Sequence, residues 1–152
     1  MTSHDHIVPM LMRHEGTGPV KDGRLMPYQD TAGKWTIGYG RNITDRGLSE
    51  EEAQYLLEND LGLVRKELDQ ALPWWRETPD TVQVVLMNLG YNLGVLTPPE
   101  TAKLLTFTRT LDLLKSGRYA EAADNLTKTK WHTDVKGRAL ELEAMLREPV
   151  ET

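Results

Sequence analysis

The 152-residue chain contains no cysteine, which excludes disulfide bonds, zinc–thiolate centres and thiol nucleophiles. It also contains no apolar run of the roughly 18 residues that a membrane-spanning helix needs, so no stable membrane insertion is expected. The N-terminus lacks a basic segment followed by an apolar run, and this predicts that there is no signal peptide. We therefore expect the protein to accumulate in the cytoplasm of the cell that makes it, or to be packaged into a particle.

The chain also lacks an excess of positive charge, since 18 basic residues face 23 acidic ones and the net charge is −5. The net charge therefore argues against a nucleic-acid-binding role, and no nucleic-acid partner is expected. We find no glycine-rich phosphate loop and no Gly-x-Ser-x-Gly turn for a nucleophilic serine. His4 and His6 are best explained by chance, so we expect no metal site and no cofactor.

The N-terminal third alternates between short elements and turn residues. Residues 7–14 suit a short helix with Pro9 in its first turn, and residues 16–27 are rich in glycine and proline and predict a loop. A hairpin is expected with flanks at 25–29 and 34–39, because Asp30 and Gly33 stand at the first and fourth positions of a type I turn.

The remainder is dominated by helical periodicity. Ser49 and Glu52 form a capping box at the start of a long helix that Pro73 ends. Asp80 can cap the next helix, which Gly90 and Gly94 interrupt and Pro98-Pro99 breaks. Further helices are expected at about 101–116, 119–127 and 135–147.

This order of elements predicts an α+β fold in a single domain over residues 1–152. A β-rich lobe covers about residues 15–60, and a helical lobe comprises residues 1–14 and 73–152. The long helix at 49–72 joins the two lobes, with a cleft between them. A cleft suits a polymeric substrate, although a fold alone does not establish a function.

Several segments share a family pattern. Glu15-Gly16 ends the first predicted helix, and Tyr28-Gln-Asp-Thr-Ala-Gly-Lys-Trp-Thr-Ile-Gly-Tyr-Gly40 follows on the hairpin. Asn88-Leu-Gly-Tyr-Asn-Leu-Gly94, Arg118-Tyr-Ala-Glu-Ala-Ala, Trp131 and Arg138-Ala come later in the expected order. On these residues the chain resembles the phage-type lysozymes, which include those of the T-even coliphages. The resemblance covers nearly the whole chain and implies a lysozyme-like fold.

The resemblance also implies roles for individual residues. Glu15 would be the general acid, and Asp30 and Thr36 would position the attacking water. Such an arrangement implies inversion at the anomeric carbon, with the two carboxylates roughly 6.5–9.5 Å apart. Read alone, each residue type has a structural explanation: a solvated helix end for Glu15, a turn hydrogen bond for Asp30 and strand preference for Thr36.

Further positions are candidates for binding the saccharide. Gly38, next to Tyr39, alternates with Gly40, which suggests either close approach of a sugar ring or a tight bend. Asn92 resembles a saccharide-facing position, and the alternative is a local cap near Gly94. Arg138 resembles an arginine that pairs with the acid, and the alternative is a surface ion pair.

Two departures from the family pattern stand out. The segment between Glu15 and Asp30 is longer than usual, and the excess lies in the loop Thr17–Arg24, which should border the cleft. Arg41 occupies the position after the hairpin where the family has histidine, so the support of the hairpin must differ.

The resemblance predicts a muramidase that cleaves the β-1,4 bond between N-acetylmuramic acid and N-acetylglucosamine in bacterial peptidoglycan, without a cofactor. We expect a monomer of phage or prophage origin that reaches the wall through a holin or as part of a virion. One alternative is a lytic transglycosylase, which cuts the same bond without water. Asp30 and Thr36 argue against it, because that reaction does not need a pair of residues that activates water. The other alternative is a glycan-binding module that has kept the fold and lost activity.

Overall fold

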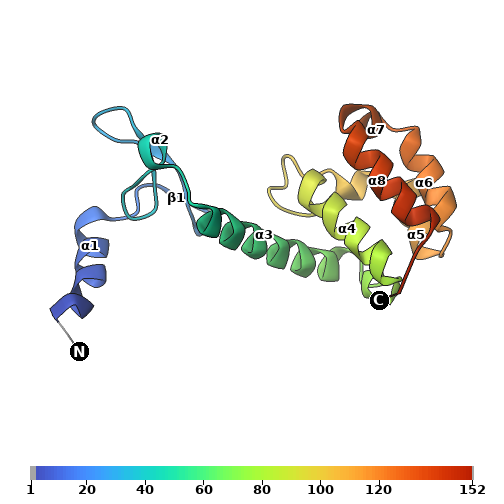
Figure 1. Cartoon of the computed structure of the whole chain (residues 1–152), viewed down its shortest axis with the longest axis horizontal. Helices are drawn as coiled ribbons and strands as arrows, with labels where there is room; N and C mark the ends of the chain where they lie inside the picture. Colours follow the sequence, from blue (N-terminus) through green and yellow to red (C-terminus); the bar gives the residue numbers. More distant parts are fainter. Residues whose placement is uncertain (1–2, 152) are drawn as a thin grey trace. The chain divides into compact units, whose positions relative to one another are not determined.

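The computed structural model describes residues 3–151 (Figure 1). The chain divides into two compact units, the first ending at Tyr55 and the second beginning at Leu56. Two small antiparallel sheets lie in the first unit, and helices make up most of the second. The predicted α+β class is therefore confirmed, whereas the assignment of all residues to one domain stays a prediction.

The first unit begins with the short 3₁₀ helix η1 (Ser3–His6) and the helix α1 (Ile7–Glu15). The predicted helix at 7–14 is confirmed to within one residue. Gly16 ends it, with a φ of 65° that favours glycine, and the Gly16 N–H donates to the Met12 carbonyl at 3.1 Å. Glu15 is thus the last residue of α1.

The predicted loop at 16–27 is wrong, because it contains a small antiparallel hairpin. The strands β1 (Val20–Lys21) and β2 (Arg24–Leu25) pair with each other. Asp22 and Gly23 connect them with φ values of 51° and 75°. Two positive φ values characterise the type I′ turn, for which Asp-Gly is a preferred sequence. The extra length between Glu15 and Asp30 therefore has a defined structure.

The main sheet of the first unit has three antiparallel strands in the order β3-β4-β5: β3 (Tyr28–Gln29), β4 (Trp35–Ile37) and β5 (Arg41–Asn42). The predicted Asp30–Gly33 turn is confirmed, since the Gly33 N–H donates to the Asp30 carbonyl at 2.9 Å. The expected extension of the second flank to Tyr39 is wrong. β4 ends at Ile37, and the next three residues turn the chain into β5, which the sequence pattern did not predict.

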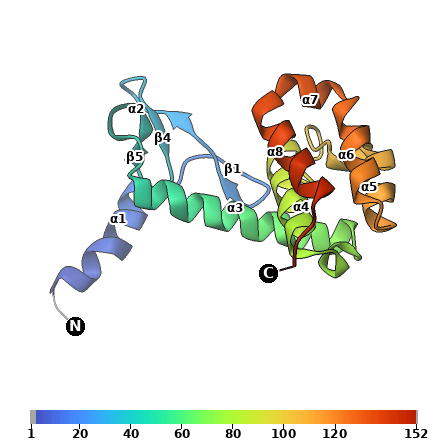
Figure 2. The same cartoon turned by 45° about the vertical axis from the view of Figure 1, so that its right-hand side comes forward.

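Two helices follow the sheet. The short helix α2 (Ile43–Arg46) packs beside β4 and β5 (Figure 2). The long helix α3 (Glu50–Ala71) then begins with the predicted capping box. The Ser49 N–H donates to Glu52 Oε1 at 2.8 Å, and the Glu52 N–H donates to Ser49 Oγ at 3.1 Å. The cap thus satisfies backbone donors that a helix start leaves without intrahelical partners.

The second unit is a helical bundle in which α8 packs against both α4 and α6 (Figure 1). Its helices are α4 (Asp80–Leu93), α5 (Thr108–Lys115), α6 (Tyr119–Thr127), α7 (Lys130–Asp134) and α8 (Lys136–Arg147), with the 3₁₀ helices η2 (Trp75–Glu77) and η3 (Leu104–Thr106). The predicted helices at 119–127 and 135–147 are confirmed. The apolar core includes the fully buried Leu86, Leu89, Leu114, Leu126 and Leu146.

Three expectations for this unit need correction. The helix expected at 101–116 is divided, because the chain leaves helical geometry at Phe107, between η3 and α5. Asp80 is the first residue of α4, and Pro79 takes the N-cap position that was expected for it. Gly90 does not interrupt α4. A Cβ there would lie 2.9 Å from Val64 Cγ1, so glycine lets α3 and α4 approach closely.

Glu67 links α3 to the loop that follows α4 through hydrogen bonds. Its buried carboxylate accepts the N–H groups of Leu96 and Thr97 at 2.9 and 3.0 Å and the Thr97 hydroxyl at 2.6 Å. Glu67→Ala leaves these donors without their acceptor, and we expect the free energy of unfolding to fall by about 2–3 kcal/mol. Chemical denaturation checks this, with Glu141→Ala on the exposed face of α8 as the control. An unchanged denaturation midpoint for Glu67→Ala would contradict it.

Within residues 3–151, helices differ in length and polarity, but none is both long enough and apolar enough to cross a bilayer. The longest, α3, carries many charged residues along its length.

Candidate active site

Glu15 projects from the end of α1 onto the backbone of the turn that precedes β5. A Cβ placed on Gly40 would lie 3.1 Å from Glu15 Oε2 and 3.4 Å from its carboxyl carbon. A side chain at position 40 would require the carboxylate to shift by a few tenths of an ångström. Glu15 itself is solvent-exposed, and within the first unit, as far as its residues are described, its carboxylate has no hydrogen-bond or ion-pair partner. It is therefore free to contact a ligand.

Asp30 occupies the turn between β3 and β4, and its two carboxylate oxygens are in different surroundings. Oδ1 accepts the N–H groups of Ala32 and Lys34, both at 2.9 Å, and so closes the turn. Oδ2 accepts no hydrogen bond from residues 3–151. The structural and the chemical interpretation of Asp30 are thus compatible, because one oxygen holds the turn while the other faces solvent.

Thr36 lies in the middle strand of the sheet and is buried. It pairs with Tyr28 on one side and with Asn42 on the other. Its hydroxyl donates to the carbonyl of Lys34 at 3.1 Å. A hydroxyl has one proton to donate and two lone pairs, so both of its acceptor positions remain for other partners.

Gly38, Tyr39 and Gly40 form the tight turn between β4 and β5. The two glycines have φ values of 66° and 81°, which residues with a side chain rarely adopt. The tight bend, one of two interpretations of these glycines, is therefore observed. Tyr39 at the middle of the turn is 47% exposed. Contact of this turn with a sugar stays a prediction.

Arg41 follows the Gly38–Gly40 turn and makes a bidentate ion pair with Glu52 at the start of α3. Arg41 Nη1 donates to Glu52 Oε1 at 2.9 Å, and Nη2 donates to Oε2. Nη1 also donates to the Gly47 carbonyl at 3.2 Å. The guanidinium holds the pKa of Glu52 at about 2, well below its ordinary value, and the backbone hydrogen bond from Ser49 acts in the same direction.

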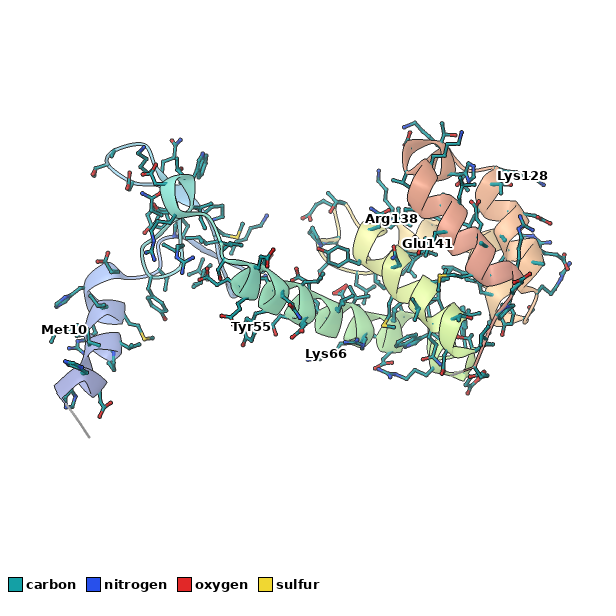
Figure 3. All side chains as sticks on the ribbon, in the orientation of Figure 1. Met10, Tyr55, Lys66, Lys128, Arg138 and Glu141 are labelled. Carbon is teal, nitrogen blue, oxygen red and sulfur yellow. The ribbon has the colours of Figure 1, made fainter. Side chains whose placement is uncertain are left out.

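The two other predicted binding residues belong to the second unit. Asn92 and Arg138 both line a hollow of about 450 Å³, together with Asp60, Leu63 and Tyr91. Asn92 does not cap α4. Its Oδ1 accepts the indole N–H of Trp131 at 2.8 Å. Arg138 lies on α8 (Figure 3) and is exposed to solvent, and its pairing with Glu15 stays a prediction.

Sequence reasoning overlooked some of the supporting residues. The contact of Glu15 with Gly40 and the pairing of Arg41 with Glu52 join segments that a motif does not connect. The Ser49–Glu52 capping box identified Glu52, but only as a helix start. Among the described residues, no group of three or more potential ligands comes together to hold a metal ion.

Gly40→Ala tests the contact between the turn and the carboxylate. The new Cβ would crowd Glu15 Oε2, and the φ of 81° would strain the backbone, so we expect the free energy of unfolding to fall by about 1 kcal/mol and any turnover that depends on Glu15 to fall about 10-fold. Gly117→Ala is the matched control, because Gly117 has a φ of 77° and nothing within 4 Å of an added Cβ. Gly117→Ala should lose stability but retain turnover. Equal turnover in both variants would contradict the contact.

Comparison with models of protein families shows to which family the chain belongs. The family model described as Phage lysozyme matches residues 16–147. The chain therefore belongs to the phage lysozyme family. The matched segment contains Asp30, Thr36 and Arg138 and begins directly after Glu15. Membership gives the protein a lysozyme-type role, with peptidoglycan as its class of substrate.

Proposed function

We propose that the protein is a muramidase, which hydrolyses the β-1,4 bond between N-acetylmuramic acid and N-acetylglucosamine. One observation carries this proposal. The turns of a single three-stranded sheet hold Asp30 at one position and support Glu15 at another. Glycoside hydrolysis needs two carboxyl groups with different roles, and a turn of this sheet and the end of α1 supply one each.

Glu15 acts as the general acid. It donates its proton to the glycosidic oxygen as the bond between that oxygen and the anomeric carbon breaks. The sugar left behind carries positive charge on its anomeric carbon and ring oxygen. The exposed position of Glu15 at the end of α1 lets it reach a bound polymer.

Asp30 and Thr36 hold the water that attacks. Asp30 Oδ2 and the Thr36 hydroxyl each offer an acceptor, so one water can donate a hydrogen to each and direct a lone pair at the anomeric carbon. Its oxygen bonds to that carbon, and one of its protons passes to Asp30. Attack opposite to the leaving group inverts the configuration.

The alternatives differ in their products. Purified peptidoglycan is incubated with the protein, and the soluble fragments are analysed by mass spectrometry. A hydrolase releases muropeptides with free reducing ends. A lytic transglycosylase releases 1,6-anhydro ends, which are lighter by one water, and an inactive binding module sediments with the wall without releasing fragments. Either of the last two results would overturn the proposal.

The proposal also covers the residues that bind the substrate, the oligomeric state and the route to the cell wall. We propose that Gly38, Tyr39, Asn92 and Arg138 contact the saccharide, and that the protein works as a monomer. It is made in the host cytoplasm and reaches the wall through a holin or as a virion component.

A further inference from the structure

The Arg41–Glu52 ion pair connects the turn beneath Glu15 to the long helix. Both side chains are partly buried, with 30% and 39% of their surface exposed. A guanidinium that pairs with a carboxylate through two nitrogens is fixed in direction as well as in distance. The backbone of residue 41 therefore has a defined position relative to the start of α3.

Glu52 is itself held rigidly. Its Oε1 accepts the Ser49 N–H as part of the capping box, in addition to Arg41 Nη1. The Gly47 carbonyl, in the segment between α2 and α3, accepts a further hydrogen bond from the same guanidinium. Arg41 thus forms hydrogen bonds with two residues near the start of α3, Gly47 and Glu52.

Gly40 precedes Arg41 directly, and its backbone is the surface on which the Glu15 carboxylate lies. Among the described residues of the first unit, no hydrogen bond or ion pair holds that carboxylate. Within this unit its position consequently depends on α1 and on the backbone of Gly40. A shift of that backbone by a few tenths of an ångström would move the surface under the proposed acid.

We propose that Arg41 and Glu52 are positioning residues that hold the Gly40 backbone in place beneath Glu15. This inference rests on the proposed role of Glu15 as the general acid. Neither residue takes part in proton transfer. They act by fixing the turn, because misplacement of a reacting group by a fraction of an ångström reduces the rate without preventing binding.

The pair is expected to withstand acid. Because the pKa of Glu52 is about 2 when folded and about 4.5 when unfolded, its contribution to stability is complete above pH 4.5 and is lost as the pH falls toward 2. The ion pair therefore holds the turn throughout the pH range above about 4.5.

The test uses Arg41→Ala, Glu52→Gln and the double variant. Gln retains the acceptor for the Ser49 N–H but loses the charge that pairs with Arg41. On soluble, uncrosslinked glycan strands, we expect kcat to fall about 10-fold in each single variant, with KM within 2-fold. The double variant should be no worse than either single one. Independent effects that multiply to about 100-fold would overturn the proposal.

Arg118→Ala is the matched control, because Arg118 makes a comparable bidentate pair with Glu121 in the second unit. It should leave kcat unchanged. A decrease in kcat equal to that of Arg41→Ala would mean that the loss of any such pair is enough, and the proposal would fail.

A second readout does not depend on catalysis. The contact between Glu15 and Gly40 predicts a nuclear Overhauser effect between the γ protons of Glu15 and the α protons of Gly40. It should be present in the unmodified protein and in Arg118→Ala, and weakened in Arg41→Ala. If the unmodified protein releases no fragments, the proposed function fails, while this effect still tests the positioning. An effect of equal strength in Arg41→Ala would overturn the positioning itself.

Discussion

Replacing Glu15 with glutamine is expected to reduce peptidoglycan hydrolysis by about 1000-fold, because the amide has no acidic proton that it can transfer to the leaving oxygen. Glutamine has nearly the same shape, and Glu15 is exposed, without a hydrogen-bond or ion-pair partner among the described residues of the first unit. The fold should therefore be retained. Release of soluble muropeptides, quantified by mass spectrometry, measures the effect.

The controls for this variant separate chemistry from folding and binding. The thermal midpoint of Glu15→Gln should lie close to that of the unmodified protein, and sedimentation with the wall should persist. Glu141→Gln, an exposed change on α8, should leave turnover unaffected. Turnover by Glu15→Gln within a few-fold of the unmodified protein would exclude Glu15 as the acid.

Replacing Asp30 with asparagine should have the second largest effect, a loss of hydrolysis of about 100-fold or more. Asparagine keeps Oδ1, so the hydrogen bonds from Ala32 and Lys34 that close the turn can remain. It loses the negative charge at the second oxygen, which the mechanism uses to accept a proton from water. The rate of muropeptide release and the free energy of unfolding are both measured.

Asp30→Ala provides the contrast. Alanine removes both functions of the side chain, so the free energy of unfolding should fall by about 1–2 kcal/mol in addition to the loss of hydrolysis. Asp30→Asn should change it by less than about 0.5 kcal/mol. If the asparagine variant hydrolyses the wall normally and only the alanine variant loses activity, Asp30 holds the turn and does not hold the water.

Local chemistry explains which elements could be predicted. The start of α3 depends on Ser49 and Glu52, three residues apart, and the turn after β3 depends on Asp30 and Gly33. Such contacts are visible in a short window of sequence. The Asp22-Gly23 turn also carried a local signal, but the surrounding glycines and prolines concealed it.

Longer-range contacts explain the rest. β5 exists because Asn42 pairs with Thr36, and strands of two residues leave almost no alternation to detect. The division of the helix expected at 101–116 depends on how the chain turns at Phe107, which helical periodicity does not reveal.

The candidate site shows the same division. Glu15, Asp30 and Thr36 stand in a motif, and the motif alone is enough to predict them as site residues. The pairing of Arg41 with Glu52 spans 11 residues, and that of Asn92 with Trp131 spans 39. Neither partner could be identified until the fold placed them together.

The anomeric configuration of the first product tests most directly whether Glu15 and Asp30 act on opposite faces of the glycosidic bond. Soluble glycan strands are digested at high enzyme concentration, and proton nuclear magnetic resonance follows the newly formed reducing end before it mutarotates. Cleavage of a β bond by water held at Asp30 predicts that the α anomer appears first. Initial appearance of the β anomer would contradict the mechanism, because it would require retention through a covalent or substrate-assisted intermediate.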